Sequence, residues 1–223
     1  MDTTAPAVRT WRWERLAPLS GIAAVLLFIA AFFVHDVIGD TPGSDAPASD
    51  YTRYYEEEDG SIWGGSILIS FAIVFFFWFV GTLRAALHAA EGGLGRLAAT
   101  AHAGGIATAV LVLASIATQV SAVLLVDARE DPIAPDTAVA YWFMGDGFFL
   151  AAFYAAAVLL AATGLILLRS RMLPRWFGWV TLALALVLLI PFVNWAAFAF
   201  VFPIWIIAAS LMLWQATSRM PAV

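Results

Sequence analysis

Residues 141–164 read YWFMGDGFFLAAFYAAAVLLAATG, and Asp146 is the one side chain among them that is charged in water. A hydrocarbon core about 30 Å thick is crossed by about 20 mostly apolar residues in a helix. The stretch therefore predicts a membrane-spanning helix that carries a carboxylate. The composition of the chain agrees, since 63% of its 223 residues are hydrophobic and 12% are charged, against about 25% charged residues in soluble domains.

Further apolar stretches predict an all-α polytopic membrane protein, a six-transmembrane-helix bundle. The six expected spans are 16–38, 62–87, 97–126, 138–168, 176–192 and 196–215. The membrane domain is thus expected over 16–215, with acidic outer loops at about 39–61 and 127–137. An interfacial segment at 1–15 and a tail at 216–223 complete the chain.

Arginine supplies all eleven basic residues, and its distribution predicts the orientation of the bundle. Arg53 and Arg129 fall on one side, together with the acidic loops. The other nine fall on the opposite side: Arg9, Arg12, Arg15, Arg84, Arg96, Arg169, Arg171, Arg175 and Arg219. Because short cytoplasmic loops accumulate arginine, both termini are expected in the cytoplasm. The bias toward arginine and alanine is typical of bacteria with G- and C-rich genomes, so the expected location is a bacterial plasma membrane.

The first outer loop contains SDYTRYYEEEDG at 49–60, which predicts a short helix before the second span. Ser49 or Asp50 is a suitable N-cap, and Gly60 is a suitable stop. Calcium takes six to eight oxygen ligands from a folded loop, whereas consecutive acids on a helix point in different directions. The run of acids is therefore interpreted as a solvated helix face.

The residue inventory argues against most enzymatic chemistry. The chain has no cysteine and no lysine, which excludes disulfides, thiolate metal sites, cysteine nucleophiles and Schiff bases. A catalytic zinc ion needs three protein ligands and a water, but His35 is predicted on the outer side whereas His88 and His102 are predicted on the inner side. We therefore expect no catalytic residues, no metal site and no cofactor.

Asp146 is the first candidate site residue. It is expected on the order of 10 Å into the membrane from the outer side, at 1.5 Å per helical residue. Ionisable residues at such depth are costly, usually face the bundle interior and suggest function. Two interpretations stay open. Asp146 either ties two helices together as a protonated or hydrogen-bonded group, or binds a proton, a cation or another ligand.

Four further polar residues are expected near the same level. Gln119 in the third span should match the depth of Asp146, and His35 and Asp36 should lie nearer the outer end of the first span. Asn194 is expected in a tight outer turn between the last two spans. Together with Asp146 they predict a polar pocket that opens outward. Each also has an ordinary role, as helix contact, interfacial group or turn residue.

Three motifs carry a resemblance to a known family. They are the Tyr54–Tyr55 pair, FFFWFVGTLRAALHAAEG at 75–92 and LPRWFGWVTLALALVLL at 173–189. The chain resembles an uncharacterised six-helix bacterial integral membrane protein family, a domain of unknown function common in high-GC Gram-positive bacteria. The resemblance implies six membrane helices and supplies neither a substrate nor catalytic residues.

The expected function follows from these exclusions. The chain is interpreted as an integral membrane protein without enzymatic activity, a regulatory or partner subunit. The alternative is a small proton- or cation-coupled transporter or channel with an outward-facing pocket around Asp146. An intramembrane enzyme is the third interpretation, weakened because the histidines are predicted on opposite sides. The expected partners are the lipid bilayer and either further copies of the chain or another membrane protein, and no nucleic acid.

Overall fold

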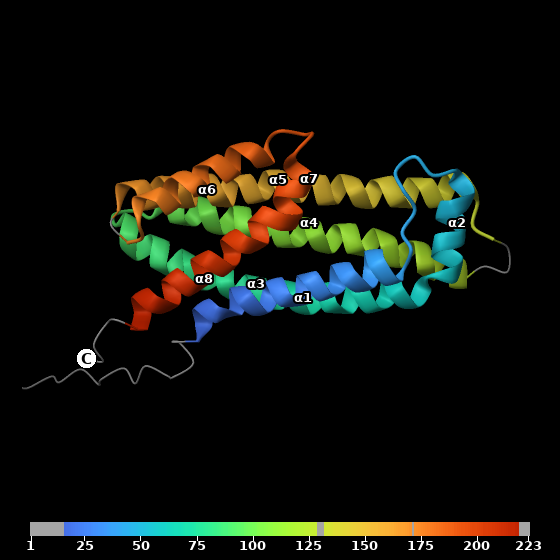
Figure 1. The fold of residues 1–223 in the computed structure, drawn as a ribbon, viewed down its shortest axis with the longest axis horizontal. Helices are drawn as coiled ribbons and strands as arrows, with labels where there is room; N and C mark the ends of the chain where they lie inside the picture. Colours follow the sequence, from blue (N-terminus) through green and yellow to red (C-terminus); the bar gives the residue numbers. More distant parts are fainter. Residues whose placement is uncertain (1–15, 129–131, 171, 219–223) are drawn as a thin grey trace, which may run out of the picture.

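The computed structural model describes residues 16–128, 132–170 and 172–218, and every regular element in this part of the chain is helical. Figure 1 shows the elements. In chain order they are η2 (Ala17–Leu19), α1 (Ser20–Phe32), η3 (Phe33–Ile38), α2 (Ala48–Glu57), α3 (Asp59–Glu91), α4 (Arg96–Asp127), α5 (Pro135–Arg169), α6 (Arg175–Leu188), α7 (Asn194–Ala196), η4 (Ala197–Val201) and α8 (Phe202–Ser218). The predicted segment at 1–15, Arg129, Arg171 and the end of the predicted tail lie outside the described residues.

Five helical stretches in the described residues are long and apolar enough to cross a membrane. They are Ala17–Ile38, Asp59–Glu91, Arg96–Asp127, Pro135–Arg169 and Asn194–Ala216. The all-α fold and the multi-pass membrane character predicted from the sequence are confirmed at this level. The sixth apolar helix, α6, has 14 residues, which span about 21 Å at 1.5 Å per residue.

The fifth predicted span, 176–192, is wrong at its end, because α6 stops at Leu188. Pro191 has no backbone N–H and disfavours helical geometry in the residue before it. The chain turns instead, with Leu189 N donating to Leu186 O and Val193 N donating to Ile190 O, at 3.1 and 3.2 Å. The turn between α6 and α8 therefore lies part of the way along α5 and not at its end (Figure 1).

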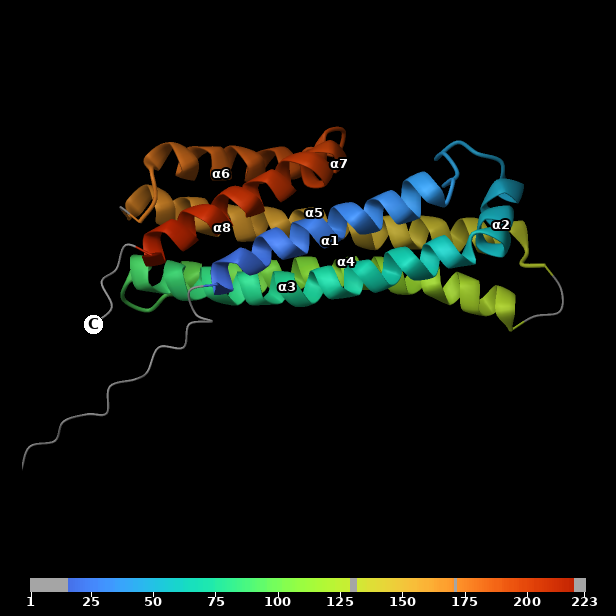
Figure 2. The ribbon, with the colours of Figure 1, turned by 60° about the horizontal axis from the view of Figure 1, so that its bottom comes forward.

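Three long helices, α3, α4 and α5, form the body of the bundle. They contain 33, 32 and 35 residues, or about 50 Å each. α1 packs on α3, and α6 packs on α5. Figure 2 shows α1 and α8 lying across one face of the long helices.

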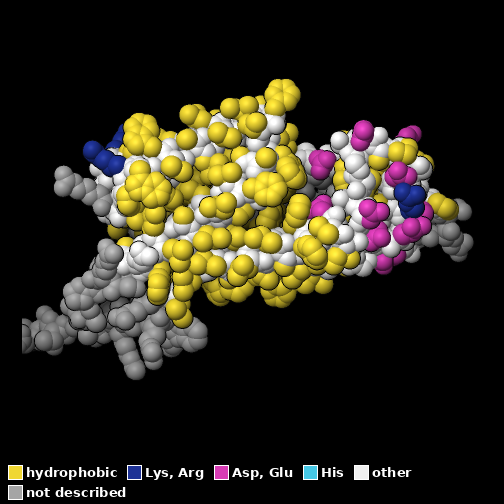
Figure 3. All heavy atoms as spheres, in the orientation of Figure 1, with side chains coloured by type: hydrophobic (Ala, Val, Ile, Leu, Met, Phe, Trp, Pro, Cys, Tyr) yellow, Lys and Arg dark blue, Asp and Glu magenta, His cyan; other side chains and the backbone are white. Residues whose placement is uncertain are grey.

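The two ends of the bundle carry opposite charge. One end, the basic end, holds the α3–α4 and α5–α6 turns with Arg96, Arg169 and Arg175, and the described chain begins and finishes there (Figure 1). The other, the acidic end, holds α2 and the carboxylates of the 39–61 segment. Figure 3 shows a hydrophobic band between them and acidic side chains gathered at the end opposite the chain termini. That the acidic end faces outward remains a prediction.

The short helix of the first loop forms, with different details from those predicted. α2 begins at Ala48 after an extended Pro47, and Gly60 lies inside α3. Tyr51, Tyr54 and Tyr55 are buried, because their spacing of three and four residues places them on one helical face. α2 thus covers the acidic end of α4 and α5 with aromatic rings.

Candidate functional site

A cavity of about 140 Å³, the acidic-end cavity, lies among α1, η3, α3, α4, α5, α7 and η4. His35, Asp36, Gln119 and Asp146 all line it. A water needs about 10–15 Å³ of such volume, so the cavity has room for several waters or a small organic group. Asn194 does not line it. This residue is buried in α7, where its Nδ2 has no hydrogen-bond partner among the described residues.

His35 and Asp36 are carried by the π-helical turn η3. The His35 Nδ1 lies 3.7 Å from the Asp36 Oδ1, and its Nε2 lies 3.3 Å from the hydroxyl of Tyr54. Thr41 Oγ1 donates to the same Asp36 oxygen at 3.4 Å. η3 continues α1 as its last turn and ends before Gly39. Here the turn directs two ionisable side chains toward α4 and α5.

Gln119 enters the cavity from α4 and is 6% exposed. Its Oε1 accepts a hydrogen bond from the hydroxyl of Tyr55, so α2 fixes the orientation of the amide. Gly145 allows α5 to approach at this level, since a Cβ there would lie 2.8 Å from Thr118 Oγ1 and 3.0 Å from Gln119 Nε2. The absence of a side chain at 145 brings Asp146 and Gln119 to one cavity.

Asp146 is exposed at the surface of this cavity. Trp142, one turn earlier on α5, lines the same cavity. Among the described residues, no hydrogen bond or ion pair joins Asp146 to another helix. Gly147 beside it has open space where a Cβ would stand. The geometry thus gives Asp146 access to the cavity.

The lining combines acidic and aromatic side chains. Two carboxylates, Asp36 and Asp146, face the cavity, and no arginine of the described chain lines it. Aromatic walls come from all sides: Phe28, Phe32, Trp142, Phe149 and Trp195. Carboxylates attract cations, and aromatic faces attract them as well, most strongly when water is excluded. The arrangement is suited to a positively charged group.

The carboxylates of the cavity contribute to raising the pKa values of two tyrosines of α2. Burial raises the pKa of Tyr55, and the charge of Asp146 raises it further. Burial likewise raises the pKa of Tyr54, with smaller contributions from Asp36, Tyr55 and Glu58. Both hydroxyls therefore remain neutral hydrogen-bond donors above the ordinary tyrosine range.

The length of α5 bears on the depth expected for Asp146. The helix from Asp146 to Arg169 extends for about 35 Å, slightly more than a hydrocarbon core of about 30 Å. α5 begins at Pro135, three residues before the start of the predicted span. The length of a helix alone does not fix its position across a membrane, so the depth expected for Asp146 stays a prediction.

Sequence reasoning missed the contacts of Tyr54 and Tyr55 with the site and the position of Trp195. The spacing of Tyr51, Tyr54 and Tyr55 was a signal for a buried face of α2, whereas the run of acids that follows them, Glu56 to Asp59, drew the interpretation toward solvent. Trp195 had no signal, because the depth of its turn depends on where α6 ends.

The described residues contain no cluster of three or more histidine and acidic side chains that could hold a metal ion. Comparison with known proteins gives no assignment: no family model, no curated protein and no solved structure matches the chain. The chain is a multi-pass membrane protein by the composition of its helices.

Proposed function

We propose that the protein is a non-enzymatic membrane protein, a regulatory or partner subunit, that binds a small organic cation in the acidic-end cavity. One observation carries this proposal. Ionisable side chains from η3 and α5 line the same cavity as Gln119 of α4, although they are far apart in sequence. A helix tie would need no cavity, and the carboxylate of Asp146 makes no bond to a second helix among the described residues.

The choice of an organic cation rests on the chemistry of the lining. A protonated amine donates hydrogen bonds to Asp36 and Asp146, and its carbon substituents contact Trp142 and Trp195. The arginine distribution favours the acidic end as the outer one. The ligand would then enter from outside the cell, near the membrane surface.

A transporter is the second candidate, favoured by the broken helix beside the cavity. α6, α7, η4 and α8 form one hairpin interrupted at Pro191, and Trp195 and Ala199 of its turn line the cavity. Discontinuous helices border binding sites in many transporters. The neighbouring cavity toward the basic end is lined by apolar side chains and Thr108, whose hydroxyl bonds to Gly104 O. A binding role without transport is therefore supported better.

The test is a binding titration of the full chain in phosphatidylcholine nanodiscs with propylammonium, followed by tryptophan fluorescence, since Trp142 and Trp195 line the site. Asp146→Asn removes one charge-assisted contact and is expected to weaken binding about tenfold or more. Asp36→Asn should act in the same direction.

Glu56→Gln is the matched control, because Glu56 is an exposed acid of α2 outside the cavity. Equal affinity in wild type and Asp146→Asn, or no saturable binding to wild type, would exclude the proposal. Propylammonium uptake into liposomes that is lost in Asp146→Asn, with unchanged stability, would favour the transporter instead.

A further inference from the structure

A groove of about 340 Å³ lies between α1 and α8 and meets the acidic-end cavity. Phe28, Phe32 and Ala199 belong to both. Along the rest of the groove the named walls are apolar, with Val25 and Ile29 on α1 and Pro203, Ile204 and Ile207 on α8. In Figure 1, α1 and α8 diverge from the basic end toward the acidic end. The groove therefore joins a charged pocket to a strip of hydrocarbon-like surface.

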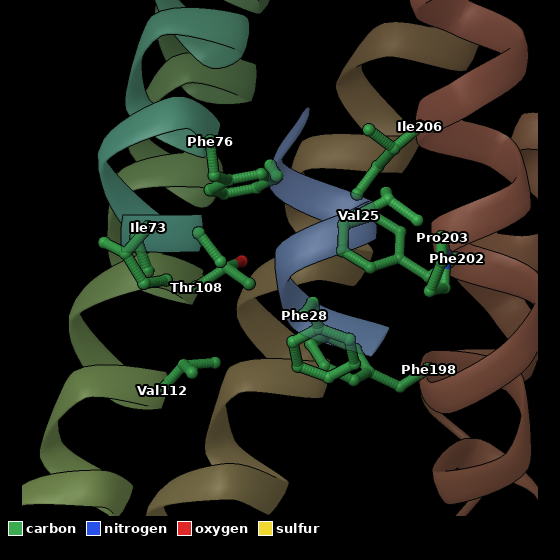
Figure 4. Close-up of a pocket in the computed structure, with 13 residues that line it drawn as sticks. Val25, Phe28, Ile73, Phe76, Thr108, Val112, Phe198, Phe202, Pro203 and Ile206 are labelled. Atoms are coloured by element: carbon green, nitrogen blue, oxygen red, sulfur yellow. The ribbon is translucent and has the colours of Figure 1, made fainter. Parts of the chain in front are cut away.

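The neighbouring cavity toward the basic end, of about 60 Å³, is the third of these spaces and extends the groove into the bundle. It shares Val25, Phe28 and Pro203 with the groove. Figure 4 shows it bordered by Phe76 of α3, Val112 of α4 and Phe202 of α8. A chain lying in the groove thus has protein beside it and beneath it, unlike a lipid on a convex helix face.

From this continuity we infer that the ligand is a single-chain amphiphile with a cationic amine head. The head occupies the acidic-end cavity and the tail lies in the groove between α1 and α8. The inference rests on the proposed function and adds the tail to its ligand. From His35 in the acidic-end cavity to Val25 at the far end of the groove the helix rises about 15 Å, close to half of the roughly 30 Å hydrocarbon core. The cavity and the groove together are therefore about as long as one leaflet is deep.

Charge complementarity selects the head group. Asp36 and Asp146 repel phosphate and carboxylate heads, and no arginine of the described chain lines the cavity to offset them. Bulk lipid tails are as apolar as the groove. The tail is therefore bound through its fit and its enclosure in the groove. The carboxylates select amphiphiles with a cationic head group.

The experiment compares decylammonium with propylammonium on the full chain in phosphatidylcholine nanodiscs, with each concentration expressed per lipid so that partitioning cancels. Ile29→Phe and Ile204→Phe enlarge opposite walls of the groove at residues that are 53% and 65% exposed. Each variant should weaken the binding of decylammonium about tenfold through overpacking. The affinity for propylammonium should stay unchanged. Two variants on different helices, each checked by thermal unfolding, guard against one that fails to fold.

Val158→Phe is the matched control, since Val158 is a half-exposed residue of α5 outside all three cavities. Decanol and decanoate should not displace decylammonium. Unchanged decylammonium affinity in both groove variants, with propylammonium still bound, would overturn the inference and leave the proposed function intact. If wild type binds no propylammonium, the proposed function fails. The inference, which rests on that function, then fails with it.

Discussion

The acidic end and the apolar body of the bundle are held together by different interactions. At the acidic end, side chains bond across elements: Tyr55 to Gln119, Tyr54 to His35, and Tyr51 OH to Gly43 O at 2.8 Å. In the body, most threonine hydroxyls turn back on their own helix, as when Thr108 donates to Gly104 O and Thr163 to Leu159 O. Trp205 Nε1 of α8 also donates across to Thr181 Oγ1 of α6 at 2.8 Å. The long helices α4 and α5 therefore recognise each other mainly by shape.

This difference follows from the surroundings. In hydrocarbon, helix association gains little from burying apolar surface and depends on close packing of small residues. Beyond the membrane, burial of the tyrosine face of α2 removes apolar surface from water and adds hydrogen bonds. The acidic-end cavity lies where the two regions meet. A change that weakens the hydrogen bonds of the acidic end should therefore leave the packing of the body unchanged, and a change that disturbs this packing should leave the acidic end unchanged.

Alkaline pH should have the largest effect, and only at the acidic end. Tyr54 and Tyr55 have raised pKa values, so their contribution to stability is complete below about pH 10 and is lost as pH rises further. Each can lower the free energy of unfolding by up to about 1.4 kcal/mol per pH unit. Equilibrium unfolding in mixed micelles, followed across this range, measures the slope.

The composition makes this titration clean, because a chain without cysteine or lysine has tyrosine as its main side chain titrating between about pH 9 and 12. Tyrosinate absorbance reports the same event. Ionisation of all five tyrosines at about pH 10 in the folded protein would contradict the prediction.

Gly104→Ala should have the next largest effect, in the body. A Cβ at Gly104 would lie 2.6 Å from Leu159 N and 2.9 Å from Ala155 O, and backbone atoms cannot move aside separately. Separating α4 from α5 is expected to cost about 2–3 kcal/mol, measured by unfolding in mixed micelles. Gly81→Ala is the control, since nothing lies within 4 Å of a Cβ there; its stability should stay the same or rise. Equal losses in both variants would show that helix contact at Gly104 is unimportant.

The same contrast explains what the sequence could predict. Helices in the body follow from apolar length alone, so five spans were found, with ends displaced by a few residues as at Asp59 and Pro135. Asp146 and Gln119 could be placed at a common level because both lie on long uninterrupted helices. Tyr54 and Asn194 could not be placed, since their positions depend on the path of an irregular loop and on the early end of α6.

Tyr55→Phe should have the smallest of these effects and confine it to the acidic end. The variant keeps the buried ring but leaves Gln119 Oε1 without its donor, at a cost of about 1–2 kcal/mol. Hydrogen exchange should increase in α2 and stay unchanged in α6 and α8. Tyr154→Phe is the control, because Tyr154 is 39% exposed on α5. Faster exchange throughout the bundle in Tyr55→Phe would mean that the two regions unfold as one unit, and that the hydrogen bonds of the acidic end also stabilise the body.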